Sequence, residues 1–138
     1  MIRLWEGFVD TVYIGFANEH LIGYGHLVRK GESYGKITKW QADSLLDTDL
    51  EKIMKICYNT TGLVGRKLLA ITAFSYNIGS NKFAKSTLNK KYISKNCNNG
   101  IYNEWVKWSH YHNGRKFVKS KALVKRRNWE VYFYKSET

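Results

Sequence analysis

WEGF at residues 5–8 and LIGYGHL at residues 21–27 are the two stretches that say most about this chain. The first stretch places a carboxylate, Glu6, beside a glycine and among apolar residues, and the second is a glycine-rich turn that ends in a histidine. An apolar neighbourhood desolvates a carboxyl group, and a desolvated carboxylic acid is a usable proton donor near neutral pH. Glu6 is therefore a candidate catalytic group, although glutamates on ordinary helix surfaces are also common.

The order and spacing of these stretches resemble the beginning of the phage-type lysozymes, family 24 of the glycoside hydrolases. The usual pattern in that family is Glu-Gly, a Tyr, a catalytic Asp and then Thr-Ile-Gly-Tyr-Gly-His. Here Glu6-Gly7, Tyr13 and Ile22–His26 match the pattern. The resemblance implies a peptidoglycan hydrolase, a muramidase that cleaves the β-1,4 bond between N-acetylmuramic acid and N-acetylglucosamine.

Two positions depart from the family pattern. The catalytic Asp and the Thr would fall on Gly15 and Leu21, which offer neither a carboxylate nor a hydroxyl. Glycoside hydrolysis uses two carboxyl groups, an acid that protonates the leaving oxygen and a carboxylate that acts as nucleophile or activates a water. Glu6 fits the role of the general acid. Asp10 or Glu19 could supply the second carboxylate, although neither has the family's spacing.

Three later segments match the family in the same order, so the resemblance covers essentially the whole chain. Residues 37–49 resemble its connecting helix, residues 74–88 its Phe-x-x-Asn-Ile-Gly stretch with the Phe-x-x-Ser-Thr-Leu that follows, and residues 121–130 its Arg-Arg-x-x-Glu helix. The resemblance implies four substrate-binding residues: Tyr24, His26, Asn77 and Arg126. For His26, a structural hydrogen-bonding role is the alternative.

The pattern of apolar residues and turn residues predicts an α+β fold that is mostly helical, with a small antiparallel sheet of three strands. The resemblance implies one lysozyme-like domain over residues 1–138. Its parts would be a small β lobe at about 9–37, a connecting helix at about 38–57 and a helical lobe at about 62–138. Strands are expected between residues 11 and 28, with a hairpin tip at Asn18-Glu19.

Helices are predicted at five places after residue 37 from periodicity and end signals. A capping box, Thr38 to Gln41, begins one that should end near Cys57, before a turn at residues 58–63. The most apolar segment, residues 68–79, should be the buried central helix, with Gly79 as its end. The remaining predictions are a helix and turn at residues 89–99, a short helix at 100–109 with Trp105 and Trp108 in the core, a loop at 110–120 and a last helix at 120–134.

Composition excludes a disordered chain, because 43% of the residues are hydrophobic and 15% are aromatic. The net charge is +12, from 23 basic and 11 acidic residues, and the basic excess lies mostly after Gly62. Such a charge favours a polyanionic partner, which can be peptidoglycan, another anionic wall polymer, acidic lipid or nucleic acid. A dense basic stretch near the end of the chain is the candidate contact surface: Arg115, Lys116, Lys119, Lys121, Lys125, Arg126 and Arg127.

Neither the histidines nor the two cysteines have a metal-ligand spacing, so no cofactor or metal is expected. Cys57 and Cys97 are expected to be reduced, packed thiols, with a disulfide as the alternative. No secretory signal pattern and no membrane-spanning stretch is visible. The expectation is a protein made in the host cytoplasm that reaches the wall after holin-type release or as a virion component, and a monomer unless it is part of a virion.

Three functional hypotheses follow, in this order. The first is an active muramidase, and the second is a catalytically inactive lysozyme-like protein that binds cell wall or a protein partner. Loss of wall lysis on Glu6→Gln separates these two. The third is a basic nucleic-acid-binding protein, which predicts an affinity that falls steeply with salt. No nucleic-acid-reading motif supports the third hypothesis.

Overall fold

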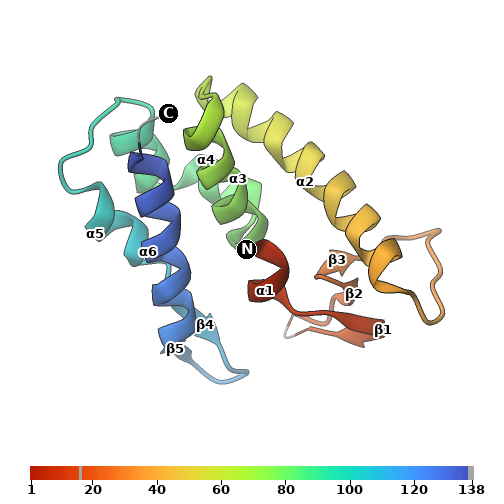
Figure 1. Ribbon diagram of the computed structural model, residues 1–138. Coiled ribbons are helices and arrows are strands. Elements are labelled where there is room, and N and C mark those ends of the chain that lie inside the picture. Colours follow the sequence, from red (N-terminus) through yellow and green to blue (C-terminus); the bar gives the residue numbers. More distant parts are fainter. Residues whose placement is uncertain (16, 137–138) are drawn as a thin grey trace. The chain divides into compact units, whose positions relative to one another are not determined.

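The computed structural model describes residues 1–15 and 17–136 (Figure 1). It is mostly helical, with a three-stranded and a two-stranded antiparallel sheet, so the predicted α+β class is confirmed. The chain divides into two compact units, which we call the N-terminal unit (residues 1–51) and the C-terminal unit (residues 52–138). Among the described residues, no helix combines the length and the apolar character needed to cross a membrane.

The N-terminal unit begins with a short helix and a three-stranded sheet. Its elements are α1 (Ile2–Glu6), β1 (Val9–Ile14), β2 (His20–Gly23) and β3 (His26–Leu27). The strands pair antiparallel in the order β1-β2-β3, and Tyr13 lies opposite Leu21. The pairing of β1 with β2 is irregular between Val9 and Tyr13. The three expected strands are therefore present.

The turn between β1 and β2 lies where the sequence predicts it. The amide of Gly15 donates to the carbonyl of Glu19 at 2.9 Å, and the amide of Asn18 donates to the carbonyl of Gly15 at 3.1 Å. Asn18 has a φ of +62°, a conformation that asparagine tolerates better than most residues. The turn therefore returns Glu19 to a position directly beside Gly15.

Helix α2 (Lys39–Thr61) begins with the predicted capping box. The amide of Thr38 donates to Oε1 of Gln41 at 2.9 Å, and the amide of Gln41 donates to Oγ1 of Thr38 at 3.1 Å. The sheet packs on this helix through Gly23, where a Cβ atom would lie 3.2 Å from Cβ of Ala42. Gly23 therefore has a packing role.

The end of α2 corrects the prediction, because the helix continues through residues 58–61 instead of turning there. The hydroxyls of Thr60 and Thr61 donate to the carbonyls of Ile56 and Cys57, both at 2.8 Å. These bonds let threonines remain inside a helix, although their composition is typical of a turn. The helix ends at Gly62, which has a φ of +71°.

The C-terminal unit is built around α3 (Gly65–Ile78), which has six consecutive buried residues, Ala70 to Ser75. Its other elements are α4 (Ser80–Lys85), a π-helical segment η1 (Leu88–Ile93), α5 (Ile101–Val106), β4 (His110–His112), β5 (Phe117–Lys119) and α6 (Lys121–Lys135). Helices α3 and α6 lie side by side (Figure 1). The central helix, its end at Gly79 and the last helix are confirmed.

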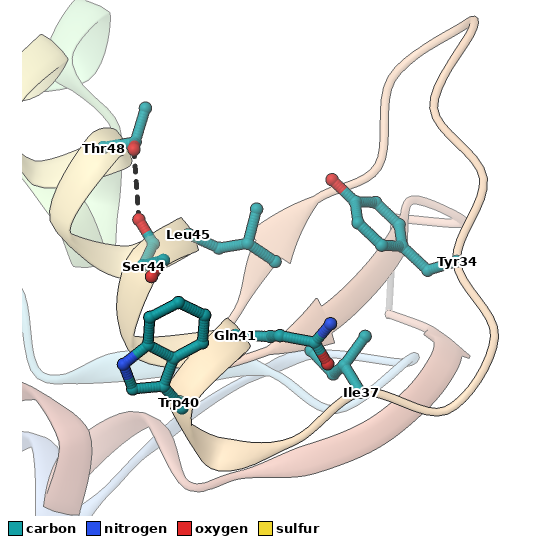
Figure 2. Close-up of a pocket in the computed structure, with 7 residues that line it drawn as sticks. All are labelled: Tyr34, Ile37, Trp40, Gln41, Ser44, Leu45 and Thr48. Atoms are coloured by element: carbon teal, nitrogen blue, oxygen red, sulfur yellow. Dashed lines mark hydrogen bonds between the residues drawn. The ribbon is translucent and has the colours of Figure 1, made fainter.

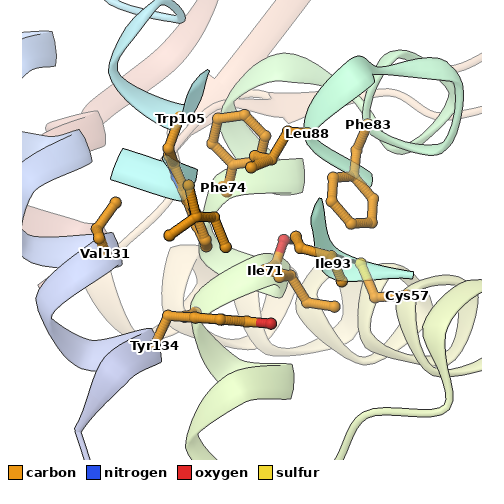
Figure 3. Close-up of a cluster of buried hydrophobic side chains, with 11 residues drawn as sticks. Cys57, Ile71, Phe74, Phe83, Leu88, Ile93, Trp105, Val131 and Tyr134 are labelled. Carbon is orange, nitrogen blue, oxygen red and sulfur yellow. Dashed lines mark hydrogen bonds between the residues drawn. The ribbon is translucent and has the colours of Figure 1, made fainter. Parts of the chain in front are cut away.

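The core of the C-terminal unit is aromatic at its centre (Figure 3). The ring of Phe74 lies 5.4 Å from that of Trp105 and 6.1 Å from that of Phe83, and Trp105 lies 5.3 Å from Tyr134, measured between centroids. Trp105 is fully buried, and Trp108 packs against the cluster. The expected core role of this tryptophan pair is confirmed.

A hairpin replaces the loop predicted at residues 110–120. Strands β4 and β5 pair antiparallel, with Tyr111 opposite Val118. The turn is held by Oδ1 of Asn113, which accepts from the amides of Arg115 and Lys116 at 3.0 and 3.1 Å. Five of the six strand residues are exposed, so the sequence has no alternation of buried and exposed positions that could reveal the strands.

The cysteines are free thiols, Cys57 buried and Cys97 partly exposed. The thiol of Cys57 donates to Oγ of Ser75 at 3.3 Å, and burial raises its pKa. A buried thiol with a raised pKa is poorly nucleophilic, so Cys57 acts as a core residue.

Candidate functional site

Glu6 is the last residue of α1 and is partly buried. The helix stops there because Gly7 adopts a φ of +70°, and the Gly7 amide donates to the carbonyl of Arg3 at 3.0 Å. Nε of Arg3 also donates to Oδ1 of Asp43 at 2.6 Å, which ties α1 to α2. Both ends of this short helix are thus fixed, and Glu6 is held at the point where the chain leaves α1 for β1.

Tyr13, on β1, is a tyrosine on which the charges of both Glu6 and Glu19 act. Its pKa is raised first by burial and then by the negative charges of Glu6 and Glu19. The negative charge of a nearby carboxylate disfavours ionisation of a phenol. The phenol of Tyr13 is therefore within the electrostatic field of both carboxylates. Sequence reasoning assigned no role to this tyrosine, although the family pattern includes it.

The carboxylate of Glu19 lies against Gly15. A Cβ atom built on Gly15 would be 2.6 Å from Cδ of Glu19 and 3.2 Å from its Oε2, and closer still to Oε1. The Oε2 atom is buried and has no hydrogen-bond partner within the described residues. The side chain of Glu19 thus fills the space that any side chain at position 15 would need.

Asp10, the other candidate for the second carboxylate, is engaged elsewhere. Its Oδ2 atom lies 3.6 Å from Nζ of Lys36, in a pair that is largely exposed. Its carbonyl accepts from the amide of Ile37 at 2.9 Å. Asp10 therefore faces the loop before α2, and its charge is not among those that act on Tyr13.

His26 connects β3 to α2 and to the following loop. Its Nδ1 atom lies 2.8 Å from Oδ2 of Asp49, and its Nε2 atom lies 3.2 Å from Oε2 of Glu32. Glu32 also accepts from the amide of Arg29 and from the hydroxyl of Tyr34, both at 2.8 Å. With both ring nitrogens engaged, His26 has the geometry of the structural alternative.

Tyr24 is 8% exposed and packs on Phe8, with ring centroids 5.7 Å apart. Such burial leaves little of its ring for contact with a polymer. Asn77 is exposed at the end of α3, and its Oδ1 atom accepts from Nη2 of Arg127. The structure thus places Asn77 in the C-terminal unit with its carbonyl oxygen already used by an arginine.

Arg126 is buried in the same unit. It is 3% exposed, and its guanidinium donates to Oε2 of Glu130 at 3.2 Å and to the carbonyl of Ala73 at 2.8 Å. Arg127 is fully buried and donates to both oxygens of Glu130, at 2.7 and 2.9 Å. Both guanidinium groups therefore hold the interior of the unit together.

These contacts correct the prediction of a continuous basic surface near the end of the chain. Arg126 and Arg127 belong to the interior, because Glu130 and backbone carbonyls compensate their charges there. The rest of the predicted stretch is exposed: Arg115, Lys116, Lys119, Lys121 and Lys125.

A shallow pocket of about 300 Å³ lies on the N-terminal unit, and none of the residues that the sequence indicated as site residues lines it (Figure 2). Trp40, Gln41 and Ser44 on α2 form one side of it, and Tyr34 comes from the preceding loop. Trp40 is 76% exposed. Sequence reasoning missed this surface, because an aromatic residue inside a capping box gives no sign of exposure. No metal-binding group of histidine, cysteine or carboxylate side chains is formed by the described residues.

Comparison with known proteins gives one consistent relationship. The family model described as Phage lysozyme matches residues 3–130. An endolysin of Acyrthosiphon pisum secondary endosymbiont phage 1 is 30% identical over 141 residues, which cover 99% of this chain and 93% of that protein.

Solved structures agree with the family match. An endolysin from Escherichia coli O157:H7 phage FAHEc1 has a TM-score of 0.78 and 27% identity, over 97% of this chain and 87% of that one. The muramidase domain of SpmX from Asticaccaulis excentricus has a TM-score of 0.83 and 24% identity, over 99% and 92% of the two chains, and shows the shared fold. The expectation of a phage-type lysozyme is confirmed: this chain belongs to the phage lysozyme family of peptidoglycan hydrolases.

Proposed function

We propose that this protein is a catalytically active muramidase that hydrolyses the β-1,4 bond between N-acetylmuramic acid and N-acetylglucosamine, with Glu6 as the general acid. The observation that carries the proposal is the position of the Glu19 carboxylate, which lies against Gly15 in the same unit that holds Glu6 at the end of α1. Glycoside hydrolysis needs two carboxyl groups on one site, and Glu6 and Glu19 of the N-terminal unit are the two that we propose. The names endolysin and muramidase domain among the relatives agree with this chemistry.

Glu6 suits the acid role because of its position. It is partly buried at the end of α1, where Arg3 and Gly7 fix the backbone around it. A carboxylic acid held in place beside the glycosidic oxygen can protonate the leaving group as the bond breaks. Tyr24 and His26 support this site from within the unit, through Phe8 and through Asp49 and Glu32.

The substrate is an anionic wall polymer, and the C-terminal unit has the complementary charge. It contains 18 basic and 3 acidic residues, among them the exposed Lys121 and Lys125 on α6. Such a field concentrates the protein on a polyanion. The proposal includes synthesis in the host cytoplasm and access to the wall after holin-type release or as part of a virion.

The test is release of muropeptides from purified peptidoglycan, comparing the parent with Glu6→Gln. We expect the variant to lose at least about a hundredfold in rate, the usual contribution of a general acid. Glu51→Gln, which removes an exposed carboxylate from α2, is the matched control and should leave the rate unchanged.

Three results would contradict or redirect this proposal. Full activity in Glu6→Gln would exclude Glu6 as the acid. No release from the parent, with the protein still sedimenting with the wall, would favour an inactive wall-binding protein. No release and no sedimentation, with an affinity for DNA that falls steeply with salt, would favour nucleic-acid binding.

A further inference from the structure

We infer that Glu19 supplies the second catalytic carboxylate, and that Gly15 and Glu19 form a compensated pair in which the acidic group has moved across the β1–β2 turn. This inference rests on the proposed muramidase function and names the group that its mechanism lacks. Nothing in the family match or in the names of the relatives assigns this role to position 19.

The first step of the argument is the space beside Gly15. The turn hydrogen bonds between residues 15 and 19 bring the backbone of Glu19 next to that of Gly15. The side chain of Glu19 folds back toward Gly15. Its Cδ atom lies 2.6 Å from the position that a Cβ atom on residue 15 would occupy. The carboxylate of Glu19 thus occupies the place from which a side chain at position 15 would act.

The second step is the reason for the glycine. Gly15 is not among the glycines with positive φ, so its backbone conformation is open to any residue. A side chain there would overlap with the carboxylate of Glu19 in its present position and would displace it. A glycine at position 15 therefore leaves the space that the Glu19 carboxylate occupies, which couples the two residues.

The third step is the state of the carboxylate. Its Oε2 atom is buried without a hydrogen-bond partner among the described residues. A glutamate at a hairpin tip would ordinarily extend into water, and a buried oxygen without a partner opposes folding. A buried polar group without a partner calls for an explanation, and a catalytic role is one that applies to a carboxylate. The opposite strand adds Tyr13, whose pKa responds to both Glu6 and Glu19.

The chemistry requires no further group. Glu6 donates its proton to the glycosidic oxygen as the bond from that oxygen to the anomeric carbon breaks. Glu19 stabilises the positive charge that develops on the sugar ring and accepts a proton from the water whose oxygen attacks the anomeric carbon. The proton on Glu19 then returns to Glu6 through solvent. One water is consumed, and both carboxyl groups end as they began.

Leu21 agrees with this arrangement. It lies opposite Tyr13 in the sheet and two residues after Glu19. An apolar side chain there cannot orient a water, so the carboxylate itself must do so. Asp10 is the weaker candidate, because it is paired with Lys36.

The experiment measures muropeptide release by Glu19→Gln, Glu19→Ala and the double variant Gly15→Asp/Glu19→Ala, with circular dichroism to confirm folding. We expect Glu19→Gln and Glu19→Ala to lose at least about a hundredfold in rate. The double variant returns an aspartate to the family position and should recover at least about tenfold over Glu19→Ala. Asp10→Asn should remain at the parent's rate.

A second readout is independent of activity. Carbon-13 NMR of labelled tyrosine rings, with Tyr13→Phe to identify the signal, measures the pKa of Tyr13. We expect Glu19→Gln to lower this pKa toward the ordinary value of 10.0, and Glu51→Gln to leave it unchanged. An unchanged Tyr13 pKa in Glu19→Gln would contradict the placement of Glu19.

Different experimental results would contradict the proposed function and the role of Glu19. Loss of activity in Glu6→Gln together with full activity in Glu19→Gln would overturn the role of Glu19 and leave the proposed function standing. A folded double variant without activity would overturn the inference that the carboxylate of Glu19 performs the role of an acidic residue at position 15. An inactive parent would overturn both.

Discussion

Glu130 in the C-terminal unit and Glu19 in the N-terminal unit both bury carboxylate oxygens, but their surroundings are opposite. Glu130 is fully buried and accepts from Arg126, from Arg127 and from Nε1 of Trp105 at 3.1 Å. Glu19 is only partly buried, yet one of its oxygens has no partner among the described residues. A compensated carboxylate is a structural element, whereas an uncompensated one is retained for another reason, and we assign that reason to catalysis.

The two units also differ in charge. The N-terminal unit has 8 acidic and 5 basic residues, and the C-terminal unit has 3 acidic and 18 basic residues. Positive charge in the second unit suits attraction to a polyanion, while the acidic groups proposed for catalysis all belong to the first. Binding and chemistry can therefore be tested on separate sets of residues.

The largest effect is expected from Glu130→Gln. This change leaves two buried guanidinium groups without their anion, and breaking a buried pair in this way costs about 3–5 kcal/mol. Urea unfolding followed by the amide NMR signals of α6 measures the loss. The control is Glu104→Gln, which removes an ion pair with Lys107 whose lysine is 67% exposed and should cost at most about 1 kcal/mol. Equal losses in the two variants would show that the buried pairs of Glu130 contribute no more to stability than the ion pair of Glu104 with Lys107.

Glu19→Gln should change stability in the opposite direction. Neutralising the carboxylate lowers the cost of burying an oxygen without a partner, so we expect a gain of about 1 kcal/mol. Thermal unfolding of Glu19→Gln measures the gain, and Glu51→Gln should show none. A gain in stability combined with a loss of activity is the usual sign of a residue retained for function. A destabilised Glu19→Gln would instead indicate a structural role for this carboxylate.

The sequence was sufficient to predict the family and those structural features that have a local cause. The capping box at Thr38, the hairpin tip at Asn18 and the end of α3 at Gly79 each depend on one side chain or one backbone conformation. The β4–β5 hairpin was missed because both faces of it are exposed and only burial produces an alternating pattern.

Prediction of the candidate site needed more knowledge of tertiary contacts than the sequence provides. The burial of Arg126 and Arg127 requires Glu130 together with carbonyls of Ala73 and Trp108, which are distant in sequence. For Glu19, the sequence offered a carboxylate at a hairpin tip but not the direction of its side chain. The pairing of β1 with β2 fixes that direction, and the overlap with Gly15 appears only then.

The smallest expected effect concerns Glu32, a carboxylate that is paired but near the surface. The amide of Arg29, the hydroxyl of Tyr34 and the ring of His26 lower its pKa from 4.5 to about 2. A carboxyl whose pKa is lower in the folded state stabilises the fold above pH 4.5 and loses this contribution as the pH falls to about 2. The stability difference between the parent and Glu32→Gln should therefore be constant above that range and shrink within it.

Thermal unfolding at intervals across the range measures this difference. Subtracting the stability of the variant from that of the parent at each pH removes the contribution of the other carboxylates, which titrate in both proteins. A difference that stays the same down to the lowest pH would show that Glu32 is not held by these three donors, and the loop that connects β3 to α2 would need another anchor than His26.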